Sequence, residues 1–264
     1  MSSLFYSYIF IINKIKFMNQ EEQTYDFPTE KVELPSKGLV YPETNPLSKG
    51  FILMRYMRAK EEDILTNQSF IQNGTVLDKL MQSLIVTKIN YDDLIVGDKN
   101  AIMVAARVLG YGKDYTVNYA GEEENIDLSQ LENKPFDETF VPKNGVNEFT
   151  FTTPSTGDVL TYKILTHGDE IKIKADLEGL KKINKEGNPE LSTRLKYMIT
   201  SINGNREQKD IRSYVDNTML VQDSRALRKH IKSVQPDVNL TFMPKGSDKL
   251  IDIPIGINFF WPDA

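Results

Sequence analysis

The sequence contains no cysteine and only two histidines, His167 and His230, among its 264 residues. The absence of cysteine excludes disulfides, thiolate zinc sites, iron–sulfur clusters and cysteine nucleophiles. Neither histidine lies in an acid–nucleophile pattern, and no G-x-S-x-G turn occurs. Because a catalytic site needs several convergent groups, we predict that the chain is not an enzyme and holds no cofactor and no metal.

Basic charge is not in excess. Lysine and arginine total 32 and aspartate and glutamate total 37, which gives a net charge of -5. Proteins that hold nucleic acid through its phosphates need a surplus of cations. We therefore predict that nucleic acid is not a direct ligand. The 40% hydrophobic and 26% charged residues are typical of a globular protein.

A long hydrophobic run is also missing. Residues 4–12 (LFYSYIFII) are apolar, but Lys14 and Lys16 follow, and a membrane helix needs about 20 apolar residues. The run lacks the preceding positive charge and the small-residue cleavage site of a secretory signal. We predict no membrane association and interpret residues 1–17, before Met18, as an upstream start-site extension or a loosely attached tail.

Hydrophobic periodicity predicts an α+β fold of two halves, each combining helices with a β-hairpin of antiparallel strands. The predicted divisions are a flexible or upstream extension at 1–24, a first half at 25–130, a linker at 131–147 and a second half at 148–264. The linker is predicted from its prolines, glycine and acids, which interrupt the apolar periodicity.

In the first half, a strand is predicted over 50–57, and Ile64, Gln68 and Ile71 fit one face of a helix. A later hairpin turns at Ala120-Gly121. The second half is expected to begin with a hairpin that turns at 154–158 and to continue with four helices, one of them over 188–202. It ends on the alternating apolar residues of 251–261, which predict a long strand.

Several polar motifs have local explanations. Thr75 with Asp78 fits a capping box, and Asp98 and Asp223 fit the N-cap positions of later helices. The run 110–113 (GYGK) lacks the other residues of a phosphate-binding loop and fits a helix end. The acidic run 122–124 matches no EF-hand and fits a solvated hairpin tip better than a cation site.

Two surface motifs each have two possible roles, contact with a partner protein or support of the fold. Arg225 and Arg228 follow Asp223 on a predicted helix and fit either a specific polar contact or the exposed side of a capped helix. Phe260, next to Trp261, points away from the Ile-rich face of the predicted terminal strand. It is buried either by another element of this chain or by another subunit, because exposed apolar patches usually mark contacts.

Six segments carry a family resemblance. They are LPSKGLVYPETNPLSKGFILMRYMRAKEEDILTN (34–67), GTVLDKLMQSLI (74–85), LIVGDKNAIMVAARVLGYG (94–112), RLKYMITSINGN (194–205), VQDSRALRKHI (221–231) and IPIGINFFWP (253–262). In this order, and over residues 25–264, the chain resembles the baseplate hub protein family of T-even-type contractile-tailed bacteriophages. Some relatives carry paired cysteines in hairpins near the positions of Tyr119 and Met243, so a metal-ribbon role does not carry over to this cysteine-free chain.

The resemblance implies a baseplate hub component that is assembled in the host cytoplasm, located in the virion and bound to other baseplate, hub and tail proteins. Self-association stays open. An alternative is a chaperone that assembles the hub and leaves before the virion is complete. A third, a hub-associated cell-wall hydrolase, needs paired acids or metal-ligand spacing that the sequence does not show. The candidate interface residues are Arg55, Arg58, the turn 35–42, Arg225, Arg228, Phe260 and Trp261.

Overall fold

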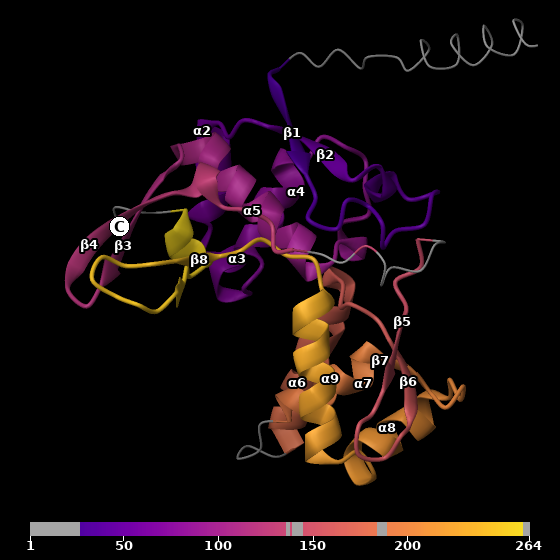
Figure 1. The fold of residues 1–264 in the computed structure, drawn as a ribbon. Helices are drawn as coiled ribbons and strands as arrows, with labels where there is room; N and C mark the ends of the chain where they lie inside the picture. Colours follow the sequence, from indigo (N-terminus) through magenta and orange to yellow (C-terminus); the bar gives the residue numbers. More distant parts are fainter. Residues whose placement is uncertain (1–26, 136–137, 139–144, 184–188, 261–264) are drawn as a thin grey trace, which may run out of the picture.

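The computed structural model describes residues 27–135, 138, 145–183 and 189–260. In these residues, helices and antiparallel strands occupy separate stretches of the chain, which confirms the predicted α+β class. Figure 1 shows two lobes, the first above and the second below. The predicted extension at 1–24, much of the predicted linker and Trp261 lie outside the described residues.

The first lobe packs two hairpins and several helices around one central helix, α5. Its elements are β1 (Thr29–Glu33), β2 (Phe51–Arg55), α2 (Ala59–Leu65), α3 (Gln68–Gln72), α4 (Val76–Leu84), the 3-10 turn η2 (Tyr91–Asp93), α5 (Val96–Tyr111), β3 (Asp114–Tyr119) and β4 (Glu122–Asp127). Ile102 and Ala106 of α5 are fully buried. The apolar side chains of this helix therefore form the core of the lobe.

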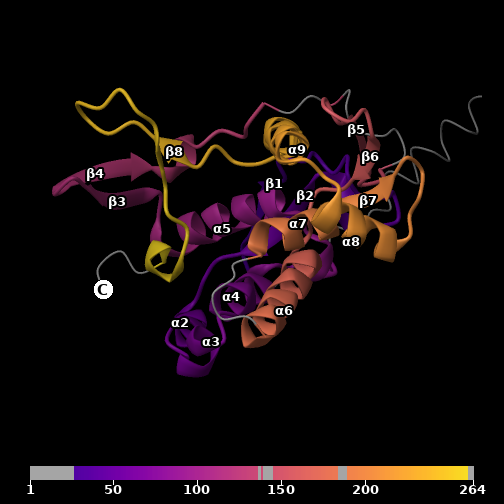
Figure 2. The same cartoon turned by 90° about the horizontal axis from the view of Figure 1, so that it is seen from below.

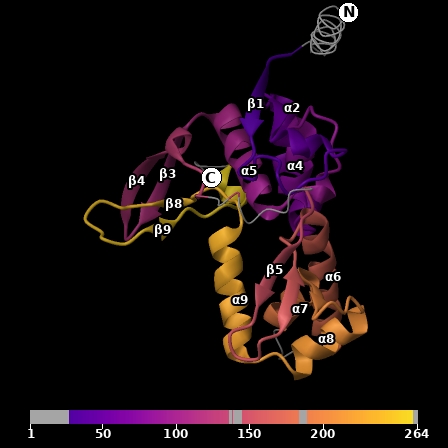
Figure 3. The same cartoon turned by 45° about the vertical axis from the view of Figure 1, so that its right-hand side comes forward.

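The hairpin of β3 and β4 forms as predicted. Ala120 and Gly121 connect the two strands with φ values of 53° and 89°, and two positive φ angles are typical of a type I′ turn. Figure 3 shows this hairpin projecting from the first lobe beside β8 (Thr241–Phe242). The prediction of a fully solvated acidic tip is wrong at Glu124, which is buried and accepts a 2.8 Å hydrogen bond from the Lys245 amide.

The second lobe contains a three-stranded antiparallel sheet in the order β5-β6-β7. Its elements are β5 (Phe149–Thr152), β6 (Val159–Tyr162), α6 (His167–Ile183), α7 (Glu190–Met198), β7 (Ile199–Ile202), α8 (Gln208–Asn217) and α9 (Val221–Val234). Phe149 stacks on Tyr162 with ring centroids 5.5 Å apart, and the ring of His230 on α9 lies 5.1 Å from that of Phe151. The contacts of His230 with Phe151 and Tyr162 pack α9 against the β5–β6 hairpin.

The predicted helix over 188–202 is wrong at its C-terminal end. The helix α7 stops at Met198, and Ile199–Ile202 form β7 against β6. Ile199 and Ser201 are buried while their neighbours are only partly buried, which is the alternation of a strand. The β-branched Ile199 and Thr200 favour this outcome once β6 offers hydrogen bonds.

The chain returns to the first lobe after α9. Val238 bridges to Asn133, and the carbonyl of Phe259 accepts a 2.9 Å hydrogen bond from Nε of the buried Arg107 on α5. Phe259 also meets the ring of Tyr115 at 4.9 Å. The contacts therefore place the segment after α9 with the first lobe, whereas the sequence-based division at 148–264 assigns it to the second half.

The predicted long strand over 251–261 is wrong for most of its length. Up to Phe260, where the described residues end, the strand of this range is β9 (Ile251–Asp252), which pairs with β8, and the 3-10 turn η5 (Ile257–Phe259) follows. Pro254 has no N–H to donate to a ladder, so the strand ends before it. The alternating apolar side chains pack into the first lobe instead, where Ile253 and Phe259 are buried.

The first helices also differ from the prediction. Ile64 lies in α2 whereas Gln68 and Ile71 lie in α3, because Asn67 caps α3 by accepting a hydrogen bond from the Phe70 amide. The predicted capping box of α4 does not form. Its N-cap Thr75 makes no side-chain capping hydrogen bond.

Asp98 and Asp223 are not the N-caps of their helices. The N-cap positions belong to Ile95 and Leu220, and each aspartate occupies the third helical position and is fully buried. Asp223 Oδ1 accepts a 2.8 Å hydrogen bond from the Ser155 amide of the β5–β6 turn. Each aspartate therefore ties a distant loop to the start of a helix.

A short backbone contact joins the two lobes. Ile95 pairs with Thr166 as an isolated antiparallel bridge, and the His167 amide donates a 2.7 Å hydrogen bond to the Leu94 carbonyl. Figure 2 shows α6 alongside the first-lobe helices, and Lys174 Nζ reaches the Asn73 carbonyl at 3.2 Å. Among the described residues, no helix combines the length and apolarity needed to cross a membrane.

Candidate functional site

A groove of about 630 Å³ lies between the lobes, where α4 and α5 face α6 and α7. Its walls combine apolar side chains with charged ones. The apolar group is Ile71, Val76, Leu77, Val96, Met103, Ile255 and Ile257, and the titratable group is Asp78, Lys99, His167, Glu170 and Arg194. Because the residues come from five helices of both lobes, α3 to α7, and from the C-terminal segment, the groove exists only when the two lobes are together.

The polar centre of this groove is a cluster of Asp78, Tyr91, Lys99 and His167. Lys99 Nζ lies 3.1 Å from His167 Nδ1 and also pairs with Asp78. Tyr91 Oη donates to Asp78 at 3.2 Å, and its ring meets the imidazole edge-on with centroids 4.7 Å apart. An ammonium can only donate, so we assign Nδ1 as the acceptor and Nε2, 3.7 Å from Asp78 Oδ2, as the protonated nitrogen.

The surroundings of His167 disfavour its protonated form. Burial, followed by the nearby Lys99 ammonium, lowers the pKa of His167, and the carboxylates of Asp78, Asp92 and Glu170 oppose that shift only in part. The folded pKa lies below the unfolded value of about 6.5. The contribution of His167 to stability is therefore present above that pH and is lost as the pH falls below it.

We predict that Lys99→Met raises the pKa of His167 toward its ordinary value, because the variant removes the neighbouring positive charge. The measurement is an NMR titration of the imidazole protons. His230, whose pKa is lowered by burial alone, is the internal control and is expected to titrate as before. An unchanged His167 titration would contradict the assigned contact between Lys99 and the imidazole.

The charged groups of the groove mostly pair with one another. Arg194 binds Glu170 through two hydrogen bonds of 2.7 and 2.9 Å and also contacts Glu190 at 3.2 Å. Within the described ranges, no cluster of histidine and acidic side chains is arranged to hold a metal ion. This arrangement can align the two lobes, and it leaves neither Asp78 nor Glu170 as an unpaired carboxylate for proton transfer.

A second surface lies on α9 of the second lobe. The sequence-predicted Arg225 and Arg228 are exposed there together with Lys229 and Lys232. The spacing of these cations puts them along one side of the helix, and we call them the basic face of α9. No side-chain hydrogen bond or ion pair joins any of these four cations to another described residue. The opposite side of α9 is buried, including Leu227 and Ile231.

An apolar groove runs beside this basic face. It encloses about 370 Å³ and is lined by Glu190, Leu191, Arg194, Leu195, Met198 and Arg228. We call it the α7–α9 groove. Leu191 is 45% exposed, and Val221, which precedes the basic face on the same side of α9, is 81% exposed. Arg228 belongs to both features, so the cations and the apolar side chains form one continuous surface.

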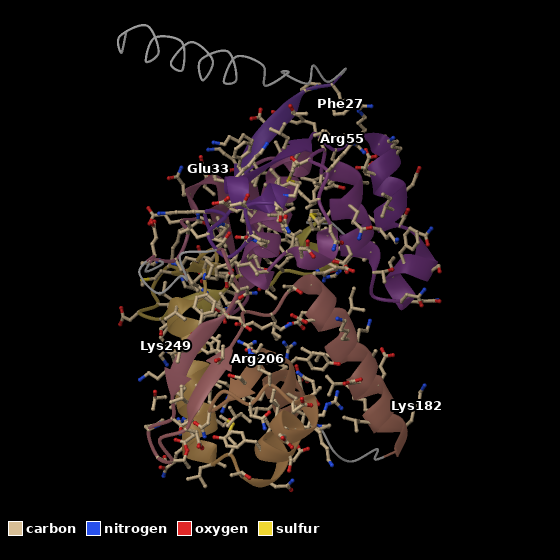
Figure 4. All side chains as sticks on the ribbon, turned by 90° about the vertical axis from the view of Figure 1, so that its right-hand side faces the viewer. Phe27, Glu33, Arg55, Lys182, Arg206 and Lys249 are labelled. Atoms are coloured by element: carbon tan, nitrogen blue, oxygen red, sulfur yellow. The ribbon has the colours of Figure 1, made fainter. Side chains whose placement is uncertain are left out.

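The remaining candidate residues lie apart from this surface. Arg55 binds Glu61 through two hydrogen bonds of 3.1 and 2.8 Å and donates to the Ser83 carbonyl, so it supports the fold. Arg58 is exposed, with its guanidinium 5.4 Å from the Phe27 ring centroid. Figure 4 labels Arg55 and Phe27 near one end of the first lobe.

The turn 35–42 and Phe260 are also less available than expected. Ser36 and Tyr41 of the turn are buried against α5, where both donate to Asp98. Phe260 is fully buried and meets Phe259 at 5.6 Å, so another part of this chain covers it. This corrects its assignment as an interface candidate, because its side chain has no exposed area to offer a partner.

We predict that Arg55→Met lowers the free energy of unfolding by about 2 kcal/mol, because it leaves the buried carboxylate of Glu61 without its main partner. Burial raises the pKa of Glu61, but hydrogen bonds from Arg55 and the Arg58 amide outweigh it and lower the pKa overall. Urea unfolding measures the change. The control Arg58→Met removes an exposed charge, with an expected change within about 0.5 kcal/mol. Equal effects would contradict the structural role of Arg55.

Sequence reasoning missed the cluster around Lys99 and the groove residue Leu191. Asp78, Lys99 and His167 are far apart in the chain, and nothing in their local spacing links them. Leu191 lies in the predicted helix over 188–202, but the apolar periodicity alone does not indicate that its side chain stays exposed. Comparisons of the chain with protein-family models, with curated proteins and with solved structures find no match.

Proposed function

We propose that the protein is a structural component of the baseplate hub of a contractile phage tail and works by binding other tail proteins. The structural observation that supports this is the combined surface of the basic face of α9 and the α7–α9 groove. It presents cations and apolar side chains that the described chain does not cover. Exposed apolar area beside charge is typical of protein interaction sites.

The family resemblance supplies the identity of the assembly. Two of the six segments, 194–205 and 221–231, cover much of α7 and α9 and therefore much of this surface. The segment 34–67 includes the loop that is tied to α5 and runs on through β2 and α2. The resemblance thus extends to both the framework and the surface that we propose for binding.

The geometry favours binding over hydrolysis. A glycoside hydrolase needs two carboxyl groups that converge on the bond to be broken. In the groove between the lobes, Asp78 pairs with Lys99 and Glu170 pairs with Arg194. We therefore expect no clearing of cell-wall material by the purified protein. A zone of lysis that scales with protein concentration would contradict this expectation.

A genetic test addresses the proposal directly. Phage carrying a nonsense codon early in this reading frame are expected to produce few complete baseplates in a non-suppressing host, and plasmid-borne wild-type protein is expected to restore them. Electron microscopy of lysates is the measurement. Normal contractile tails without the protein would contradict the proposal. A hub-assembly chaperone predicts the same defect, so its separation from a structural subunit depends on whether the protein stays in the particle.

A further inference from the structure

We propose that the basic face of α9 and the α7–α9 groove together bind an acidic, amphipathic segment of a partner protein. The inference rests on the proposed function and specifies the chemistry of the partner.

The positive charge of the basic face of α9 indicates that the partner is negatively charged. Arg225, Arg228, Lys229 and Lys232 stand on the exposed side of α9, and no described acid pairs with them. Some cations elsewhere in this lobe do pair with acids, as Arg206 does with Glu148. The chain as a whole carries a net charge of -5, so the basic face is a local reversal of sign. An acidic partner would complement this face and be steered toward it.

Shape indicates that the partner also carries apolar side chains. The α7–α9 groove is walled by Leu191, Leu195 and Met198, with Arg228 at its rim. The other arginine of the groove, Arg194, is already held by Glu170 and Glu190. A helix that places leucine-sized side chains at i, i+3 and i+7 can fill such a groove while its acids face the cations.

The same features favour a protein over nucleic acid or a membrane surface. The groove that continues the basic face is apolar and holds no aromatic ring, whereas single-stranded nucleic acid is usually held by aromatic stacking. An apolar groove of about 370 Å³ also offers no favourable contact to phosphate groups. Nucleic acid and anionic lipid are therefore the competing outcomes of the test.

The test uses the full chain and a fluorescein-labelled peptide of about 18 residues, with leucine at helical i, i+3, i+4 and i+7 spacing and glutamate elsewhere. We expect the peptide to bind the wild-type protein, with an affinity that falls as salt is raised. The double variant Arg225→Glu/Arg228→Glu is expected to weaken binding at least about tenfold. Leu191→Ser is expected to weaken it as well.

Matched controls separate this surface from general effects. Lys172→Glu/Lys209→Glu makes the same change in charge at exposed positions of α6 and α8, and Ile171→Ser removes a side chain that is 50% exposed on α6. Both are expected to bind the peptide as the wild type does. All substituted side chains are exposed, so unfolding curves should agree within about 0.5 kcal/mol for the charge variants.

Three results would overturn the inference. The first is no measurable binding of the peptide to the wild-type protein. The second is binding that is equally weakened in the charge variants of α9 and in their controls. The third is displacement of the peptide by a single-stranded oligonucleotide or by phosphatidylserine vesicles that bind the wild type more tightly and the α9 variant poorly. None of these results bears on whether the protein is present in phage particles. The proposed function is therefore tested independently of this inference.

Discussion

Asp98→Ala is expected to lower the free energy of unfolding by about 3 kcal/mol, because it leaves several buried donors without an acceptor. Asp98 accepts hydrogen bonds from the Ser36 amide at 2.9 Å, the Ser36 hydroxyl at 2.7 Å and the Tyr41 hydroxyl at 2.7 Å. Tyr41 Oη in turn accepts from the Ile95 amide at 3.1 Å. The variant therefore releases the 34–41 loop and the start of α5 together.

The control for this variant is Asp98→Asn. Its amide keeps the shape of the side chain and one acceptor oxygen, and its NH₂ can donate to the hydroxyl oxygens of Ser36 or Tyr41. We expect it to change the free energy of unfolding by no more than about 1.5 kcal/mol. Urea unfolding at neutral pH measures both. An alanine variant as stable as the asparagine variant would contradict the account of this buried site.

The wild-type protein and the Asp98→Asn variant together test a pH dependence of stability. Burial raises the pKa of Asp98 to about 6, although hydrogen bonds from Ser36 and Tyr41 act in the opposite direction. The unfolded carboxyl has a pKa of about 3.9. Because the folded state binds the proton more tightly, this contribution to stability is fully present below about pH 4 and is lost as the pH rises through about 6.

Relative to Asp98→Asn, the wild-type protein is therefore expected to lose stability on the order of 2 kcal/mol between about pH 4 and about pH 7. The asparagine variant lacks the titrating group and retains every other one, so the difference between the two curves isolates Asp98. A difference that stays constant over this range would mean that the Asp98 carboxyl titrates alike in the folded and unfolded chains.

Gly97→Ala is expected to destabilise the protein by about 3 kcal/mol, although glycine to alanine within a helix ordinarily stabilises by about 1 kcal/mol. A Cβ at Gly97 would overlap the Pro236 carbonyl oxygen and lie 2.8 Å from its carbonyl carbon and 2.9 Å from Asp237 Cα. These are backbone atoms that cannot rotate away. The alanine therefore forces α5 and the returning C-terminal segment apart.

Gly179→Ala is the matched control, because Gly179 also lies within a helix, α6, and an added Cβ there meets nothing within 4 Å. We expect this variant to gain up to about 1 kcal/mol. Thermal and urea unfolding of the two variants should therefore move in opposite directions. A gain in stability in both would contradict the close approach of residues 236–237 to α5.

Local features of the fold could be predicted from the sequence. The Ala120-Gly121 turn, the end of α5 within the run 110–113 and the hairpin of β5 and β6 all depend on residues within a few positions of one another. The strand around β2 was predicted for the same reason. Turn residues, glycine at helix ends and short-range periodicity act locally, so a single sequence carries them.

The features that depend on distant partners could not be predicted. The sequence places Asp98 and Asp223 at helix starts, but their partners Ser36 and Ser155 lie more than 60 residues away. Ile199 and Ile202 fit a helical face as well as a strand, and only pairing with β6 decides between the two. The apolar alternation after Ile251 marks burial against the first lobe, which resembles a strand pattern in sequence.

The candidate site was predicted in part. The position of Arg225 and Arg228 after a predicted helix start favours exposure, and the structure places both on the exposed side of α9. The apolar wall of the α7–α9 groove was not predicted, because Leu191 and Met198 come from a helix that only the fold brings beside α9. Arg55 is a candidate because it lies in the predicted strand over 50–57, and Phe260 because it points away from the Ile-rich face of the predicted terminal strand. The structure places both inside the first lobe.

The most direct test of the central claim is quantitative mass spectrometry of purified mature phage particles and of the infected-cell lysate from which they came. A structural hub subunit predicts that peptides from residues 25–264 persist in the particles at a constant ratio to other baseplate proteins. Peptides that are abundant in the lysate and missing from the particles would contradict the structural role and indicate an assembly chaperone. Their absence from all phage material would contradict the baseplate assignment itself.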